Sequence, residues 1–174
     1  AFRFDVGFDY VAYYEAVNMT GNLELLLIWE PLTLPIIALA RWFNQPQLFF
    51  VIYSTLTYFF LLKAISKLSV KKHLSFGFYL LFPLFYYDSF SLIRQHLAIS
   101  IFLYNLINVK EENKIKFIFW LVIGSLFHYP SLLTIIIYPL RKVKLNQYVY
   151  ICTIIVSFII GPLLVAYLVP YFHF

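Results

Sequence analysis

Three polar residues stand side by side in a strongly apolar stretch, FSLIRQHLA (90–98). The guanidinium of Arg94 has the planar geometry that binds an oxyanion such as phosphate through two parallel hydrogen bonds, and Gln95 adds a neutral donor beside it. His96 lies two residues after Arg94, on nearly the opposite face of a helix, and is more typical of a packing or interfacial histidine. The alternative for Arg94 is an interfacial arginine paired with Asp88.

A second group of residues suits proton transfer. His128 begins the motif HYPS (128–131), and an imidazole titrates near physiological pH. A lone histidine in an apolar stretch otherwise hydrogen-bonds to a neighbouring carbonyl. Glu30 precedes Pro31 at a predicted helix start, where a carboxylate is either a simple cap or a functional acid. No metal-ligand spacing, phosphate-cradling glycine loop or nucleophile elbow is present in the sequence.

The N-terminal segment carries a further polar motif, RFDVGFDY (3–10). In this motif Gly7 permits a tight turn, and Asp9 can accept a hydrogen bond from it. The tyrosines that follow fit either an interfacial aromatic belt or a surface on which a sugar stacks. They are Tyr10, Tyr13 and Tyr14.

The composition places these residues in a membrane protein. Hydrophobic residues make up 63% of the 174 residues and charged residues only 12%. One water-soluble globule of this size cannot bury so much apolar surface. The formal net charge of +5 does not indicate nucleic-acid binding, because the basic residues gather at the ends of apolar segments.

The elements that must position the polar residues are apolar stretches at 48–66, 74–90, 92–109, 117–140 and 145–169. Each is close to the about 17–25 residues that a membrane-spanning helix needs. All the lysines lie near the ends of these stretches or between them, in clusters at 63–72, 110–116 and 141–144. Because positive charge is retained on the cytoplasmic side, all three clusters are predicted to be cytoplasmic. We therefore expect an all-α fold, a polytopic transmembrane helix bundle.

The predicted crossings decide where the polar motifs lie. Between the first two clusters the chain must go out and back, which leaves YYDSFSLIRQH (86–96) near the outer surface. Between the second and third clusters only 117–140 is available. Because Pro130 breaks helical hydrogen bonding, we interpret 117–140 as two half-length helices that meet at His128, a broken or re-entrant pair partway into the membrane. The alternative is one kinked crossing with the third cluster outside.

Residues 1–47 hold most of the acidic residues and a short apolar span interrupted by two prolines. We predict that this segment is extracytoplasmic, and that residues 48–169 form the transmembrane helices of a single membrane-embedded domain (1–174). The start at Ala1 predicts a piece of a longer polytopic protein. Arg3, Arg41 and Arg94 all fall on the outer side, where positive charge is scarce, so each needs another reason to be there.

The order of these motifs resembles the EpsG family of membrane proteins in bacterial exopolysaccharide biosynthesis, which is similar to Wzy-type polysaccharide polymerases. The resemblance rests on RFDVGFDYVAYYEA, EPL, SLIRQHLAISIFL and GSLFHYPSLL and covers roughly residues 1–140. The sequence departs from the family pattern at Phe8 and Pro130. Carried over residue by residue, the pattern highlights Arg3, Gly7, Asp9, Tyr10, Tyr13, Glu30, Arg94, Gln95, His128 and Ser131.

The resemblance implies a multi-pass glycosyltransferase of the bacterial inner membrane, alongside exopolysaccharide export and chain-length proteins. It would join polyprenyl-diphosphate-linked oligosaccharide repeat units at the outer leaflet. A sugar hydroxyl would attack the anomeric carbon of another chain while polyprenyl diphosphate leaves. Arg94 and Arg3 would stabilise the diphosphate without a metal or other cofactor, and the base would be His128, Glu30 or Asp9. The residues expected to bind substrate are Arg3, Tyr10, Tyr13, Gln95 and Ser131.

Two other functions stay open at this point. In a transporter or flippase for the lipid-linked oligosaccharide, the same arginines would bind diphosphate without chemistry. In a non-catalytic structural subunit, Arg94 and Asp88 would satisfy each other. A transporter needs a cavity that opens on both sides, whereas the polar residues here are concentrated on one. Full-length family members have a further first helix and C-terminal helices, so this piece can be inactive alone.

Overall fold

The computed structural model describes residues 7, 9–18, 29–143 and 146–168, and these residues form helices and turns without a strand. Two units are distinguished, 1–138 and 139–174, and each is described by itself. The first unit begins with helices α1 (Tyr10–Asn18), α3 (Thr33–Trp42), α4 (Pro46–Leu68), α5 (Lys72–Leu81), α6 (Pro83–Tyr86) and α7 (Asp88–Ser91). It continues through α8 (Ile93–Lys110), α9 (Lys114–Phe127) and the 3-10 helix η1 (Tyr129–Ile136) into α10 (Ile137–Leu140).

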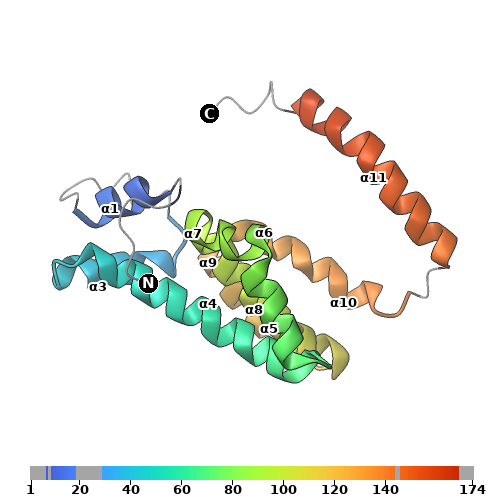
Figure 1. The fold of residues 1–174 in the computed structure, drawn as a ribbon, viewed down its shortest axis with the longest axis horizontal. Coiled ribbons are helices and arrows are strands. Elements are labelled where there is room, and N and C mark those ends of the chain that lie inside the picture. The colour runs from blue at the N-terminus through green and yellow to red at the C-terminus, as the bar shows by residue number, and fades with distance from the viewer. Residues whose placement is uncertain (1–6, 8, 19–28, 144–145, 169–174) are drawn as a thin grey trace. The chain divides into compact units, whose positions relative to one another are not determined.

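Helix α4 packs along α8, and this pair forms the centre of the first unit (Figure 1). Pro46 occupies the first turn of α4, where its missing N–H costs nothing. Among the described residues, α4 is the one helix whose length and composition allow it to cross a membrane. The all-α fold class is confirmed for the described residues, whereas one such helix does not confirm the predicted polytopic bundle.

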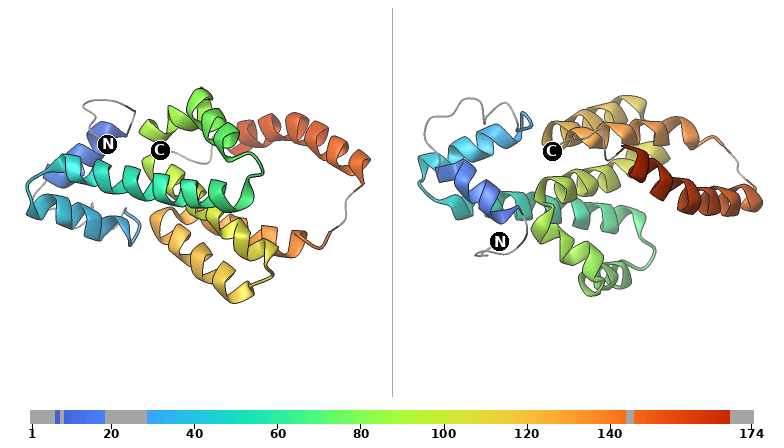
Figure 2. Two further views of the ribbon diagram at one scale, coloured as in Figure 1. Left: turned by 60° about the horizontal axis from the view of Figure 1, so that its bottom comes forward. Right: turned by 90° about the horizontal axis from the view of Figure 1, so that it is seen from above.

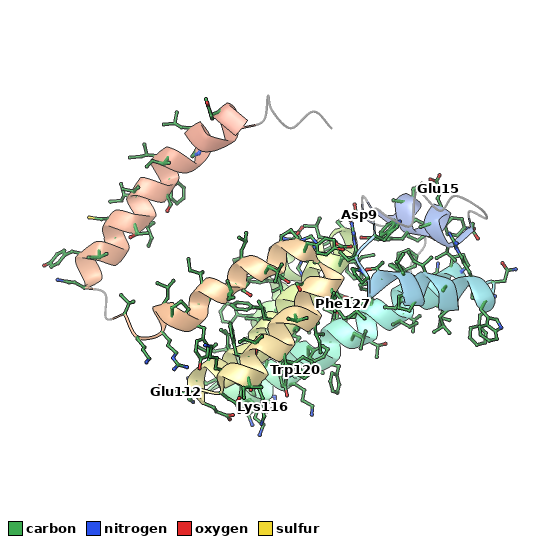
Figure 3. The ribbon with its side chains drawn as sticks, turned by 180° about the vertical axis from the view of Figure 1, so that it is seen from behind. Asp9, Glu15, Glu112, Lys116, Trp120 and Phe127 are labelled. Carbon is green, nitrogen blue, oxygen red and sulfur yellow. The ribbon has the colours of Figure 1, made fainter. Side chains whose placement is uncertain are left out.

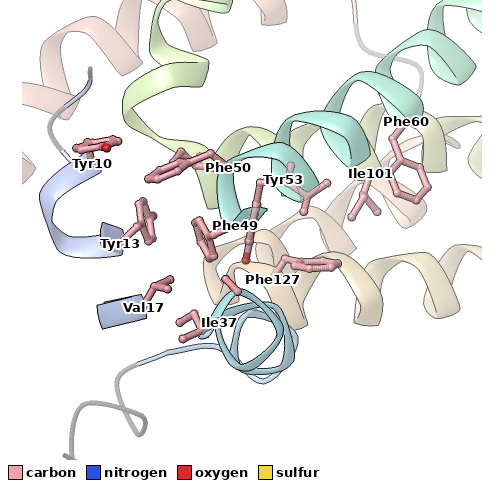
Figure 4. Close-up of a cluster of buried hydrophobic side chains, with 13 residues drawn as sticks. Tyr10, Tyr13, Val17, Ile37, Phe49, Phe50, Tyr53, Phe60, Ile101 and Phe127 are labelled. Atoms are coloured by element: carbon pink, nitrogen blue, oxygen red, sulfur yellow. The ribbon is translucent and has the colours of Figure 1, made fainter. Parts of the chain in front are cut away.

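Aromatic side chains fill the core at the N-terminal end of α4 (Figure 4). Phe49 stacks on Tyr13 of α1 with ring centroids 4.9 Å apart, and Tyr53 lies 4.6 Å from Phe49. The Tyr53 hydroxyl is 2.7 Å from the hydroxyl of Thr33 in α3, so this buried polar pair is satisfied. The core thus joins α1, α3 and α4 at one end of the unit.

The apolar stretch 74–90 does not form one spanning helix, contrary to the prediction. Helix α5 ends at Leu81, and the short helices α6 and α7 follow it. The physical reason is Pro83, which has no backbone N–H to donate and whose ring excludes a continuous helix. Phe82 before it has the extended backbone that a residue preceding proline prefers.

The predicted break at His128 is confirmed, and the chain reverses there. The ring of Phe117 near the start of α9 lies 4.9 Å from the ring of Tyr138, and the Tyr138 hydroxyl donates to the Glu112 carbonyl at 3.0 Å. A single kinked helix would separate residues 117 and 138 by about 30 Å at 1.5 Å per residue. Helices α9 and η1 therefore form a hairpin, which Figure 2 shows side by side.

The base of this hairpin is held by buried amides. Asn105 of α8 donates from Nδ2 to the Phe117 carbonyl at 2.9 Å, and Asn108 donates to Asn105 Oδ1 at 2.9 Å. Asn113 caps α9 by accepting from the backbone N–H of Lys116. These bonds join α8 to the first turn of α9, so the position of the hairpin tip depends on α8.

One of the outward arginines has a structural explanation. Arg41, in the last turn of α3, donates from Nε to the Ala16 carbonyl at 3.1 Å and also from Nη2 to the same oxygen. Ala16 lies in the last turn of α1, where carbonyl groups lack partners within the helix. Arg41 therefore holds α1 against α3.

The second unit consists of residues 139–174 and contains the helix α11 (Gln147–Leu168). Its extent agrees with the predicted apolar stretch 145–169, and Pro162 lies inside the helix. The side chains that are described in 151–160 are all exposed, which is expected of an apolar helix whose surroundings are lipid or other helices.

Candidate functional site

Arg94 contacts residues from two other segments of the first unit. It lies in the first turn of α8 and forms an ion pair through Nη1 with Glu30 Oε2, 64 residues away. Its Nε donates to the hydroxyl of Tyr13 in α1 at 3.0 Å. Its guanidinium carbon lies 4.7 Å from the ring centroid of Trp29, a cation–π distance. We call these four residues the Arg94 cage.

The alternative partner of Arg94 is not used. Asp88 lies in α7 and forms no ion pair with Arg94, so the interpretation of an interfacial arginine paired with Asp88 is wrong. Nε and Nη1 are both occupied, whereas Nη2 has no hydrogen-bond partner among the described residues. The guanidinium therefore keeps one donor group for a ligand while its charge is balanced by Glu30.

Tyr13 connects the cage to Asp9. Its hydroxyl accepts from Arg94 and lies 3.4 Å from Asp9 Oδ2, to which it donates. Burial raises the pKa of Tyr13 to about 12, so the phenol is neutral at any physiological pH and keeps the proton that it donates. Tyr13 is only 2% exposed, so its ring packs in the core and is not open to stack on a sugar.

We predict that Tyr13→Phe weakens the cage without disturbing the core. The phenyl ring keeps its packing on Phe49, but the charge-assisted hydrogen bond to Arg94 is lost, which typically costs about 1.5–3 kcal/mol. Thermal unfolding in detergent should therefore occur at a lower temperature. The matched control is Tyr14→Phe, because Tyr14 lies on the same helix and is exposed. Equal effects of the two changes would contradict the bond to Arg94.

Glu30 and His128 form the second half of the site. Glu30 is 5% exposed, and its Oε1 lies 3.4 Å from His128 Nδ1, while its Oε2 binds Arg94. The Nδ1–Oε1 direction is not that of a formed hydrogen bond, so Nδ1 is buried with no hydrogen-bond partner among the described residues. A carboxylate on this side of an imidazole favours the Nδ1–H tautomer and leaves Nε2 as the proton acceptor.

The hairpin and α3 bring His128 to Glu30. His128 occupies the break between α9 and η1 with φ −160 and ψ 105, an extended conformation. The backbone N–H of Leu32 donates to the Leu126 carbonyl at 3.1 Å, which ties the chain after Glu30 to the end of α9. Figure 3 shows that Asp9 lies toward the Phe127 end of α9 and away from Lys116. The hairpin tip is thus the point where the N-terminal segment meets α8 and α9.

A pocket of about 190 Å³ opens next to His128, between α8 and η1. Gln95 and Ser131, two predicted substrate-binding residues, line it together with His128. Other predicted residues lie elsewhere. Arg3 is outside the described residues, and Tyr10 is buried, with its ring 5.0 Å from that of Phe50. His96 lines a different, largely apolar pocket between α4 and α8.

Trp29 of this region was not recognised from the sequence, and the packing of Gly7 was not predicted. The position of Trp29 directly before Glu30 in WEPL could have indicated it, but its contact with the Arg94 guanidinium depends on the folded chain. Gly7 was interpreted as a turn residue and is one of the residues that the family pattern highlights. In the structure it has φ +95, and a Cβ added to it would lie 2.4 Å from the Phe90 carbonyl oxygen and 3.0 Å from Ser91 Cα.

We predict that Gly7→Ala separates the N-terminal segment from α7. A side chain at this position meets both an unfavourable φ and backbone atoms of Phe90 that cannot yield as a flexible side chain would. The expected cost is on the order of 2 kcal/mol or more, measured as a lowered unfolding temperature in detergent. The control is Gly77→Ala in α5, where nothing lies within 4 Å of an added Cβ and alanine should be neutral or stabilising.

Within the described part of the chain, no group of three or more His, Cys, Asp or Glu side chains is placed to hold a metal ion. The charged groups of the site are instead one guanidinium, one carboxylate bonded to it, and an imidazole beside that carboxylate. Such a set can bind an anion and move a proton.

In the residues that the structure describes, these features define a helical protein with a partly buried guanidinium–carboxylate–imidazole cluster and one apolar helix long enough to cross a bilayer. The sequence model of the EpsG family matches residues 1–173, and the chain belongs to that family. The match extends beyond the roughly 140 residues in which the resemblance was recognised. No curated protein and no solved structure matches the chain.

Proposed function

We propose that the chain acts in joining polyprenyl-diphosphate-linked oligosaccharide repeat units into exopolysaccharide, as a Wzy-like glycosyltransferase. The observation that carries the proposal is the convergence of Arg94, Glu30 and His128, from segments far apart in the sequence, next to a pocket. Membership of the EpsG family supports the reaction class. The hydroxyl of one repeat unit attacks the anomeric carbon of another, and the bond from that carbon to the diphosphate breaks.

Arg94 is assigned to the departing diphosphate. Its charge is balanced by Glu30 in the unliganded chain, which reduces the cost of keeping a guanidinium in apolar surroundings. As negative charge grows on the leaving oxygen, the Nη2 donor can bind it without a large rearrangement, because Tyr13 and Trp29 already fix the guanidinium plane. A preorganised donor of this kind stabilises the transition state more than the ground state.

His128 is assigned as the base. Three groups were candidates from the sequence. Asp9 accepts from Tyr13 and Glu30 is bound to Arg94, which favours His128 among them. His128 borders the pocket and has Glu30 on the side of Nδ1. Its Nε2 would take the proton of the attacking hydroxyl, and Glu30 would stabilise the imidazolium that results.

We further propose a multi-pass arrangement in the bacterial inner membrane, with the site on the outer side. Arg94 and Lys110 lie at opposite ends of α8, about 24 Å apart at 1.5 Å per residue. Lys67 lies in the last turn of α4, and Lys114 begins α9 at its end remote from His128. Because these lysines favour the cytoplasmic side, the cluster at the other end faces outward.

The proposal is tested by reconstituting the chain in liposomes with lipid-linked repeat unit extracted from its own host cells. The expected product is a ladder of polymerised glycan on gels, with release of polyprenyl diphosphate. If the chain only moves the repeat unit between leaflets, the unit becomes accessible on the far side without a change in length. That outcome would replace the polymerase with the transporter alternative.

A further inference from the structure

The pocket beside His128 differs in chemistry from the Arg94 cage. Its polar lining residues are neutral or weakly basic: Gln95, His128, Ser131 and Thr134. Its remaining walls include the apolar side chains of Phe102 and Pro130. No Lys, Arg, Asp or Glu lines it. Such a lining suits a neutral ligand that has hydroxyl groups and apolar faces, and it does not suit a diphosphate.

A polar atom without a partner lies beside the pocket. Ser131 Oγ is buried and has no hydrogen-bond partner among the described residues. Buried hydroxyl groups in folded proteins nearly always have a partner. Ser131 Oγ faces α9, 3.5 Å from where a Cβ on Gly124 would lie, and a rotation of its side chain would bring it to a group in the pocket. The volume of about 190 Å³ is enough for one sugar ring.

The geometry of α8 separates this pocket from the cage. Consecutive residues of an α-helix point about 100° apart, so Arg94 and Gln95 face different directions from the same turn. Arg94 is bound within the cage, while Gln95 is exposed and lines the pocket. His128 belongs to both regions, since it contacts Glu30 and also lines the pocket.

We propose that this pocket is the acceptor subsite, which holds the single sugar ring whose hydroxyl attacks. The inference rests on the proposed function and deepens it. The acceptor oxygen loses its proton to His128 Nε2 and forms a bond to the anomeric carbon of the donor. The bond between that carbon and the diphosphate oxygen breaks, and the electron pair leaves with the diphosphate on the Arg94 side.

The test measures how the donor is partitioned between sugar and water. In the liposome assay, each lipid-linked repeat unit consumed either joins the polymer or is hydrolysed to free oligosaccharide. Ala98 lines the pocket and is buried, so Ala98→Phe fills the subsite. We expect the ratio of polymerised to hydrolysed units to fall at least tenfold. Ser131→Ala, which leaves the packing intact, should lower the same ratio about three- to tenfold.

Arg94→Lys is the comparison variant, because it alters the donor side alone. It should slow polymer formation and hydrolysis together and leave their ratio unchanged. If both pocket variants lower the two products in step, or change neither, the pocket is not the acceptor subsite although the polymerase stands. If the unaltered chain consumes no repeat unit at all, the proposed function fails and the subsite with it. Size-exclusion profiles in detergent identify any variant that does not fold.

Discussion

Replacement of Arg94 by alanine is expected to abolish polymer formation while membrane insertion and expression persist. The guanidinium is the cation that the described part of the site offers to a departing diphosphate. Loss of one such preorganised group typically lowers the rate by about 10²–10³-fold. The measurement is the chain-length profile of exopolysaccharide from cells in which this gene carries the substitution. Polymer of normal length and amount would end the assignment of Arg94 to the reaction.

A second variant separates chemistry from folding. Arg94→Ala leaves Glu30 buried without its ion-pair partner, which is itself destabilising by roughly 3–5 kcal/mol. The double change Arg94→Ala with Glu30→Ala removes both charges, so unfolding temperature should recover in part while polymer remains absent. Recovery of polymer in the double variant would show that Arg94 acts only by neutralising Glu30.

Lysine substitutions at Arg41 and Arg94 test whether the site needs the planar guanidinium of arginine, which donates in two directions. Arg41 donates two hydrogen bonds to a single oxygen, the Ala16 carbonyl, and a lysine ammonium can still reach one acceptor. Arg94 donates in two directions, to Tyr13 and to Glu30. We therefore expect Arg41→Lys to retain polymer and Arg94→Lys to lose most of it.

Replacement of His128 by alanine or asparagine is expected to lower polymer formation by about 10²–10⁴-fold, the usual contribution of a positioned base. The backbone at His128 is extended, a conformation that either replacement adopts without strain, so the chain should fold and the hairpin should persist. The rate is measured in the liposome assay described above.

Two other histidines provide the controls. His73 in α5 is exposed, at the end of the unit that carries the lysines, and His73→Ala should have no effect. His96 lies two residues from Arg94 but lines the other pocket, so His96→Gln should change polymer formation by less than about threefold, as expected of a packing residue. Loss of polymer in all three variants would indicate a general effect on folding and not a base at His128.

The sequence identified the site residues more readily than their partners. Arg94, Glu30 and His128 were recognisable because a polar side chain in an apolar stretch is costly and therefore needs a reason. The partner of Arg94 was not recognisable, because Asp88 is six residues away and Glu30 is 64 residues away in the sequence. Long-range pairing depends on how α3, α8 and the hairpin pack, which residue types alone do not specify.

The reversal at His128 was predictable for two independent reasons, the proline at 130 and the lysines at both ends of the stretch 117–140. Pro83 breaks the stretch 74–90 for the same reason, but the prediction of one helix over 74–90 did not take it into account. The tyrosines show a further limit. Tyr10 and Tyr13 occur in a pattern that fits a surface belt as well as a core, and only the packing of α1 on α4 buries them.

The position of the His128 imidazole depends on the lengths of α9 and η1, the two arms of the hairpin. Both arms are fixed at their ends remote from His128. Asn105 bonds to the first turn of α9, and Tyr138 after η1 bonds to Glu112. Removing one full turn from α9 would draw the tip back by about 5.4 Å, past the reach of Glu30, without altering a single residue of the site. The number of helical turns in α9 thus sets the distance between His128 and Glu30.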